Sequence, residues 1–157
     1  MFVLWLFISA FHCANADDAG YMVLASDRES AKIFYSCLKT EDQPLNLSKS
    51  IALPVGATLR GIAYDQVGDK VYWSDKIEKK VFRMDMDGTN IEEIYSTSYV
   101  NCMEIDALYR QLYYFSRKGR LMRVYNISNG DHLTLFTFTF PDVFDLQIDG
   151  NYRLVFT

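Results

Sequence analysis

The chain has 157 residues and a formal net charge of −4 at pH 7, and 50% of its residues are hydrophobic. This balance excludes a disordered chain, and without a lysine-rich stripe nucleic acid is not expected as a partner. The 11 Tyr and 11 Phe are typical of packed β structure, whereas three Cys are too few for a disulfide scaffold.

Residues 1–16 contain no Lys, Arg, Asp or Glu, and residues 2–11 form an apolar run. The small-x-small triplet Ala14-Asn15-Ala16 follows, so this segment predicts a signal peptide whose cleavage starts the mature chain at Asp17. The run is shorter than the roughly 20 apolar residues of a spanning helix. Two alternatives stay open, an uncleaved anchor and an apolar N-terminal strand. We expect a secreted chain without direct membrane contact.

Short runs of β-branched and aromatic residues follow, separated by turn residues. In residues 21–53 they predict a blade that lacks its first strand. Residues 59–96 predict four strands, at 61–65, 70–74, 81–84 and 91–95, and residues 102–138 repeat the plan. Residues 143–157 predict part of another blade. We therefore read residues 17–157 as one architectural region.

The two complete units are related by a fixed interval. Asp65 precedes Tyr72 by seven positions, and Asp106 precedes Tyr113 by seven. The second Asp follows the first by 41 residues, and the second Tyr follows the first by 41 as well. Repeats of roughly 40–45 residues built from short strands are the signature of propeller blades. The predicted fold class is all-β, with four-stranded antiparallel blades.

The best copy of the repeat reads Asp65, a turn, and then Tyr72-Trp73-Ser74-Asp75. This resembles the class B (YWTD) repeat of the low-density lipoprotein receptor family, with Ser74 in place of Thr. The second copy keeps Asp106 and Tyr113 but loses the Trp and the final Asp. The resemblance covers about residues 21–157. It implies a six-bladed extracellular propeller, of which this chain holds a part.

The resemblance also implies an extracellular ligand-binding role, with a secreted signalling protein or a lipoprotein as partner. A propeller placed directly behind a signal peptide resembles the Wnt co-receptor branch. That placement implies a full-length parent that is a single-pass plasma-membrane receptor. The alternatives are a lipoprotein or endocytic receptor, a matrix or growth-factor-precursor propeller, and a truncated product with no function of its own.

Basic residues recur in the loops between the second and third strands of the two complete units. In propellers these loops lie on one face, so they are our candidates for contact with an acidic partner or a glycosaminoglycan. The alternative is an ordinary solvated turn. The candidates are Lys76, Lys79, Lys80, Arg117, Lys118 and Arg120. Two N-x-Ser triplets, at Asn46 and Asn126, predict glycosylation.

Other chemistry is weighed against a structural role. Asp85-Met86-Asp87-Gly88 lacks the spacing of a calcium loop and is better read as a turn. The aromatic residues Tyr72, Trp73, Tyr113 and Tyr114 suggest a ligand cage, but packing between blades is the better reading. We read Asp75 as a polar cap for the loop that follows it.

No nucleophile motif, metal-ligand spacing or phosphate loop is recognisable, so we expect neither an enzyme nor a cofactor. The rival class is a calcium-dependent propeller hydrolase, which needs acidic ligands such as Asp65, Asp106 and Asp149 in the central channel. The pair Cys37 and Cys102 is either a disulfide or two separate thiols.

Overall fold

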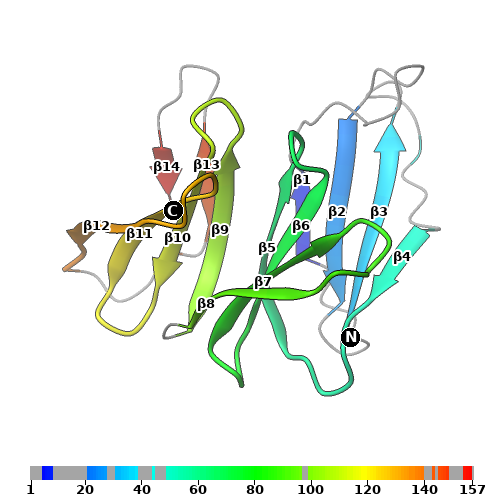
Figure 1. The fold of residues 1–157 in the computed structure, drawn as a ribbon, viewed down its shortest axis with the longest axis horizontal. Helices are drawn as coiled ribbons and strands as arrows, with labels where there is room; N and C mark the ends of the chain where they lie inside the picture. The colour runs from blue at the N-terminus through cyan, green and yellow to red at the C-terminus, as the bar shows by residue number, and fades with distance from the viewer. Residues whose placement is uncertain are drawn as a thin grey trace.

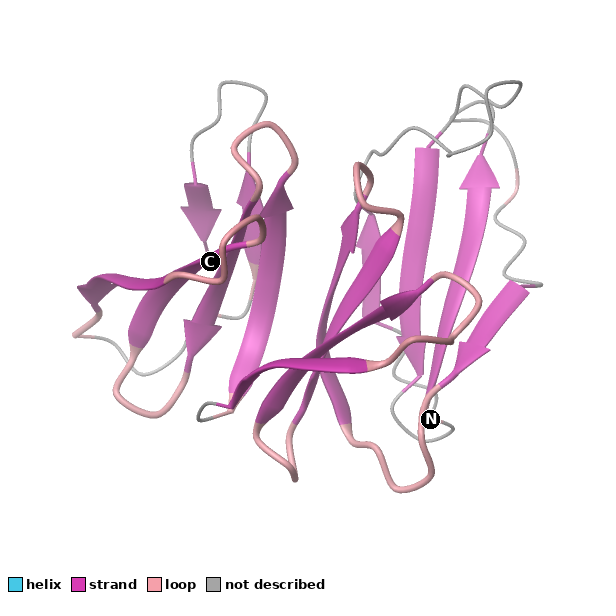
Figure 2. Ribbon diagram, viewed as in Figure 1, coloured by secondary structure: helices cyan, strands magenta, loops and turns pink. Residues whose placement is uncertain are grey.

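The structure is a computed structural model that describes residues 5–8, 21–27, 31–38, 44, 49–96, 99–139, 143, 145–148 and 154–156. Within these ranges the chain forms strands and no helix (Figure 2). The strands are β1 (Trp5–Ile8), β2 (Tyr21–Asp27), β3 (Lys32–Leu38), β4 (Lys49–Ala52), β5 (Leu59–Asp65), β6 (Lys70–Asp75), β7 (Lys80–Asp85), β8 (Glu92–Ser96), β9 (Val100–Asp106), β10 (Gln111–Ser116), β11 (Leu121–Asn126), β12 (His132–Thr137), β13 (Leu146–Ile148) and β14 (Leu154–Phe156).

The strands form three four-stranded antiparallel sheets, β1–β4, β5–β8 and β9–β12, and the two-stranded sheet β13–β14. We call the four-stranded sheets blades 1, 2 and 3. Figure 1 shows them arranged one after another along the chain. The predicted all-β fold class with four-stranded antiparallel blades is therefore confirmed.

Blade 1 contains one strand more than the sequence predicted, and this strand, β1, precedes residue 21, where the predicted blade begins. β1 pairs antiparallel with β2, with Trp5 opposite Ser26 and Ile8 opposite Val23. This is the apolar N-terminal strand that the sequence left open as an alternative, and it lies inside the segment assigned to the signal peptide. The cleavage of that segment stays a prediction.

The 41-residue period is visible in the backbone of blades 2 and 3. β9, β10 and β11 each begin 41 residues after β5, β6 and β7. The turns match as well, because Asp69 and Arg110 share a positive φ of 49° and 55°, and Lys79 and Arg120 one of 59° and 54°. The repeat therefore fixes both the strands and the turn geometry.

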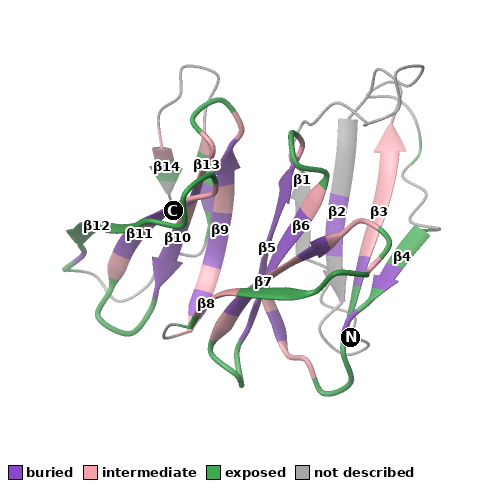
Figure 3. Cartoon of the chain, in the orientation of Figure 1, coloured by how far each residue is buried: buried purple, intermediate pink, exposed green. Residues whose placement is uncertain are grey.

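The blades pack face to face because successive side chains of a strand point to opposite faces. On β6, Trp73 enters a cluster with Leu24 and Ile33 of blade 1. Its neighbour Tyr72 enters a second cluster with Met103 and Tyr114 of blade 3. Figure 3 shows that β5, β6, β9 and β10 are mostly buried, whereas β8 and β12 are mostly exposed.

Gly88 joins the β7–β8 turn of blade 2 to blade 1, and its replacement by Ala tests that contact. Its φ is +85°, and a Cβ there would come within 3.0 Å of Cγ2 of Ile51. We expect Gly88→Ala to lower the free energy of unfolding in urea by about 1–2 kcal/mol, from backbone strain and the close contact.

Gly56 provides the matched control, because its φ is +88° and nothing lies within 4 Å of its Cβ position. Gly56→Ala introduces backbone strain without a close contact, so it should lower the free energy of unfolding by less than Gly88→Ala does. Equal losses in the two variants would show that the turn does not press on Ile51.

Candidate functional site

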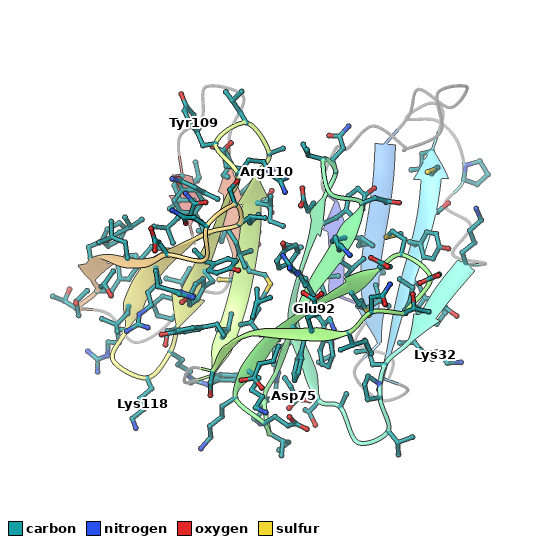
Figure 4. The ribbon with its side chains drawn as sticks, in the orientation of Figure 1. Lys32, Asp75, Glu92, Tyr109, Arg110 and Lys118 are labelled. Carbon is teal, nitrogen blue, oxygen red and sulfur yellow. The ribbon has the colours of Figure 1, made fainter. Side chains whose placement is uncertain are left out.

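The loops that carry the candidate basic residues lie at one end of the blades, the lower end in Figures 1 and 4. We define the loop face as residues 54–58, 60, 76–79, 99 and 117–120. Backbone hydrogen bonds connect its segments, since the Lys76 N–H donates to the Thr58 carbonyl at 2.9 Å and the Arg117 N–H to the Tyr99 carbonyl at 2.9 Å. The face therefore stands on a fixed backbone.

The six candidate basic residues divide into two groups. Lys76, Lys79, Arg117 and Lys118 are exposed in the loops. Lys80 begins β7, and its ammonium lies 2.8 Å from the Glu93 carboxylate and 3.6 Å from that of Glu78. Arg120 is exposed, but its Nη1 donates to the Thr139 carbonyl at 2.9 Å. Lys80 is therefore the least exposed of the six.

Asp75 fixes the β6–β7 loop from below the surface. It is 3% exposed. Its carboxylate accepts backbone N–H donations from Thr58 at 2.8 Å, Ile77 at 2.6 Å and Glu78 at 2.8 Å. Three such bonds hold two loop segments together. Asp75 is thus a cap for the loop face, and its carboxylate is already occupied.

Ser74, the neighbour of Asp75, connects two blades. Its hydroxyl accepts from the Gly61 N–H at 2.9 Å and donates to the Val100 carbonyl at 3.2 Å. Val100 opens β9, so this buried contact fixes the start of the inner strand of blade 3 against blade 2.

At the opposite end of the blades, the recurring Asp residues serve the turns. Asp65 is 1% exposed and accepts both terminal nitrogens of Arg110, with Nη2 at 2.6 Å from Oδ2. Asp106 accepts the Tyr109 N–H at 2.9 Å. Figure 4 shows Tyr109 and Arg110 at this end, away from Asp75 and Lys118. Asp149 lies outside the described residues.

The aromatic residues do not form an open cage. Tyr72 is 0% exposed, Trp73 2% and Tyr114 1%, and they divide between two packing clusters. Tyr113 is partly buried against a third cluster, and its hydroxyl donates to Oε1 of Gln111 at 2.6 Å. Ligand stacking on the first three rings is therefore excluded by burial.

The segment that begins at Asp85 is a turn. Asp85 is ion-paired with Lys70, and its Oδ2 accepts the Asn90 amide at 2.6 Å. Oδ1 of Asp87 accepts the Thr89 N–H at 2.9 Å. Across the described residues, no group of three or more His, Cys, Asp or Glu side chains is placed to hold a metal ion.

Cys37 and Cys102 do not pair with each other. Cys37 takes part in a disulfide, whereas Cys102 is a buried free thiol. Burial, with a smaller contribution from Asp145, raises the pKa of the Cys102 thiol to about 12. Cys102 therefore stays protonated and unreactive at physiological pH.

Of the two glycosylation triplets, the one at Asn126 is described and the one at Asn46 lies outside the described residues. Asn126 ends β11, and its Oδ1 accepts the N–H groups of Ser128 at 2.9 Å and Asn129 at 3.2 Å. Ser128 and Asn129 are exposed. The triplet therefore lies in a surface turn.

Glu104, which the sequence analysis did not single out, makes the stability of the chain dependent on pH. It lies partly buried on β9, and this burial together with nearby Asp145 raises its pKa from 4.5 to about 8. The folded state thus holds the Glu104 proton more tightly than the unfolded state does. The stabilisation that this proton provides is fully present below about pH 4.5 and is lost as the pH rises through 8.

We expect Glu104→Gln to be more stable than the original chain at pH 9, by on the order of a few kcal/mol, and similar to it at pH 5. Urea unfolding of both proteins at pH 5, 7 and 9 measures this difference. Parallel pH dependence of the two proteins would contradict the shifted pKa of Glu104.

Two residues of the loop face were not recognised from the sequence. Arg60, on β5, and Tyr99, just before β9, stand at repeat positions that are Asn101 in blade 3 and Thr58 in blade 2. The only sequence signal is this departure from the 41-residue pattern. The guanidinium carbons of Arg60 and Arg117 lie 5.6 Å and 5.7 Å from the centre of the Tyr99 ring.

No family model matches the chain. It is similar in structure to a chain of a solved nidogen–laminin complex, with a TM-score of 0.74 and 18% identity over 94% of this chain and 54% of that one. It is also similar to hydrazine synthase of Kuenenia stuttgartiensis, with a TM-score of 0.65 and 12% identity over 96% of this chain and 45% of that one. The first similarity supports a β-propeller fold. This chain spans about half the length of both.

Proposed function

We propose that this chain is an extracellular ligand-binding propeller whose loop face contacts a protein partner. The observation that carries the proposal is the gathering of Lys76, Lys79, Arg117 and Lys118, all exposed. The first loop is held by the buried Asp75 cap and the second by the backbone bond from Arg117 to Tyr99. A rigid scaffold that presents exposed loops is a common basis for recognition. The similar nidogen–laminin structure is itself a complex of extracellular proteins.

We further propose that the parent protein resembles a Wnt co-receptor and is anchored in the plasma membrane by a single transmembrane span. In this reading, residues 1–16 direct secretion and Asn126 carries a glycan. Within the described residues no helix has the length and apolar character needed to cross a bilayer. Expression in insect cells tests the secretory part. A secreted chain that begins at Asp17 and loses mass on deglycosylation supports it, whereas an intracellular chain contradicts it.

We propose a binding role and not an enzymatic one. A calcium-dependent propeller hydrolase needs free carboxylates in its channel, but Asp65 is bound by Arg110 and Asp106 by the Tyr109 N–H. These acids support turns between strands. They are therefore poor candidates for a catalytic metal site.

A binding assay tests the loop face. The secreted chain is passed over immobilised laminin, a Wnt protein and lipoprotein particles. We expect saturable binding to at least one of them and a loss of about tenfold or more in Lys76→Glu/Lys118→Glu. Lys49→Glu is the control, because Lys49 is exposed on β4, outside the loop face. Binding that the double variant leaves unchanged overturns the assignment of the face, and failure to bind any of the three overturns the ligand classes.

A further inference from the structure

Three segments of the loop face bring two arginines to one tyrosine. Arg60 comes from β5, Tyr99 from the connection before β9, and Arg117 from the β10–β11 turn. Both guanidinium carbons lie within 5.7 Å of the ring centre. The Arg117 N–H donates to the Tyr99 carbonyl at 2.9 Å, which fixes the turn to the residue that carries the ring. Blade 2 and blade 3 thus contribute to a single cationic cluster.

Arg60 has a free hydrogen-bond donor in this cluster. Its Nε is buried and makes no hydrogen bond within the described part of the chain. A buried guanidinium N–H without an acceptor has a cost that the Tyr99 ring offsets only in part. An incoming acceptor group would remove this cost.

The surroundings of the cluster add positive charge. Lys76 and Lys118 are exposed on the same face. The one acid of the loop face is the exposed Glu78, whose carboxylate lies 3.6 Å from the Lys80 ammonium, and Asp75 is buried beneath the face. The loop face is therefore positive although the chain as a whole carries a net charge of −4.

We propose that Arg60, Tyr99 and Arg117 form a carboxylate-recognition site for an acidic segment of the extracellular partner. This inference rests on the proposed function and names the chemistry of its ligand. Guanidinium groups bind carboxylates through two parallel N–H···O bonds, and the tyrosine holds both groups in place. Two arginines on one ring fit a short run of Asp or Glu side chains. A long sulfated polysaccharide needs a longer row of basic groups.

The test uses the full chain and a fluorescein-labelled peptide, Gly-Glu-Asp-Gly-Glu-Glu-Gly, with its Gln/Asn counterpart as the neutral control. Fluorescence anisotropy measures both affinities. We expect the acidic peptide to bind and the neutral one to bind at least tenfold more weakly. Arg60→Gln and Arg117→Gln should each weaken the acidic peptide about tenfold. Arg60→Lys should also weaken it, because a lysine keeps the charge and loses the planar fork.

Lys49→Gln is the matched control, since it removes an exposed positive charge outside the loop face. Thermal unfolding of every variant excludes loss of fold, and Arg60→Lys gives the answer if Arg60→Gln does not fold. Equal effects of Lys49→Gln and Arg117→Gln, full binding by Arg60→Lys, or stronger binding of heparin than of the peptide would each overturn the site. If Arg60→Gln still binds a partner that Lys76→Glu/Lys118→Glu loses, the proposed function stands and the carboxylate site fails.

Discussion

Replacing Arg110 with Ala is expected to lower the free energy of unfolding by about 3–5 kcal/mol, because it leaves a buried carboxylate without its counter-ion. Asp65, on β5 of blade 2, is 1% exposed, and both of its oxygens accept from the Arg110 guanidinium. Arg110 lies in the β9–β10 turn of blade 3, and its pKa is raised by the hydrogen bond to Asp65. The variant therefore breaks a buried contact between two blades. Urea unfolding at pH 7 measures the loss.

Lys70→Ala is the control for this prediction. It removes an ion pair with Asp85 within blade 2, where both side chains are about 30% exposed. Exposed pairs contribute little to stability, so this variant should unfold close to the original chain. The double variant Asp65→Ala/Arg110→Ala should recover part of the loss, because no charge is then left buried alone. If Arg110→Ala is no less stable than Lys70→Ala, the pair does not connect the blades.

The second large effect is expected at Trp73. Its ring is 2% exposed and stacks on Phe82 with the ring centroids 4.6 Å apart. It also fills the cluster between blades 1 and 2. Trp73→Ala should therefore cost about 3–5 kcal/mol by leaving a cavity between the blades. Urea unfolding, with near-ultraviolet circular dichroism for the packing, measures this change.

Trp73→Phe separates packing from hydrogen bonding. The indole Nε1 is buried and has no partner among the described residues. Phe therefore loses ring volume but no hydrogen bond, and it should cost clearly less than Ala. Equal losses for Phe and Ala would mean that the indole nitrogen makes an essential contact.

The sequence determined the repeating plan of this protein. Strand signals are local, because β-branched and aromatic residues alternate between turn residues, and the two best copies share a 41-residue spacing. From these patterns alone the all-β fold and the limits of blades 2 and 3 could be predicted to within a few residues. The burial of Tyr72 and Trp73 followed from their place inside a strand.

The tertiary structure decided which residues from different blades meet. β1 was not expected as part of blade 1, because its residues lie in the segment assigned to a signal peptide and an apolar strand was only an alternative there. Arg110 could not be assigned to Asp65, nor Arg60 and Arg117 to Tyr99, because each contact joins positions 18 to 45 residues apart. Such contacts depend on how blades stack. A local sequence pattern specifies the strands of one blade. Which side chains of the neighbouring blade contact them depends on how the faces of the two blades pack together.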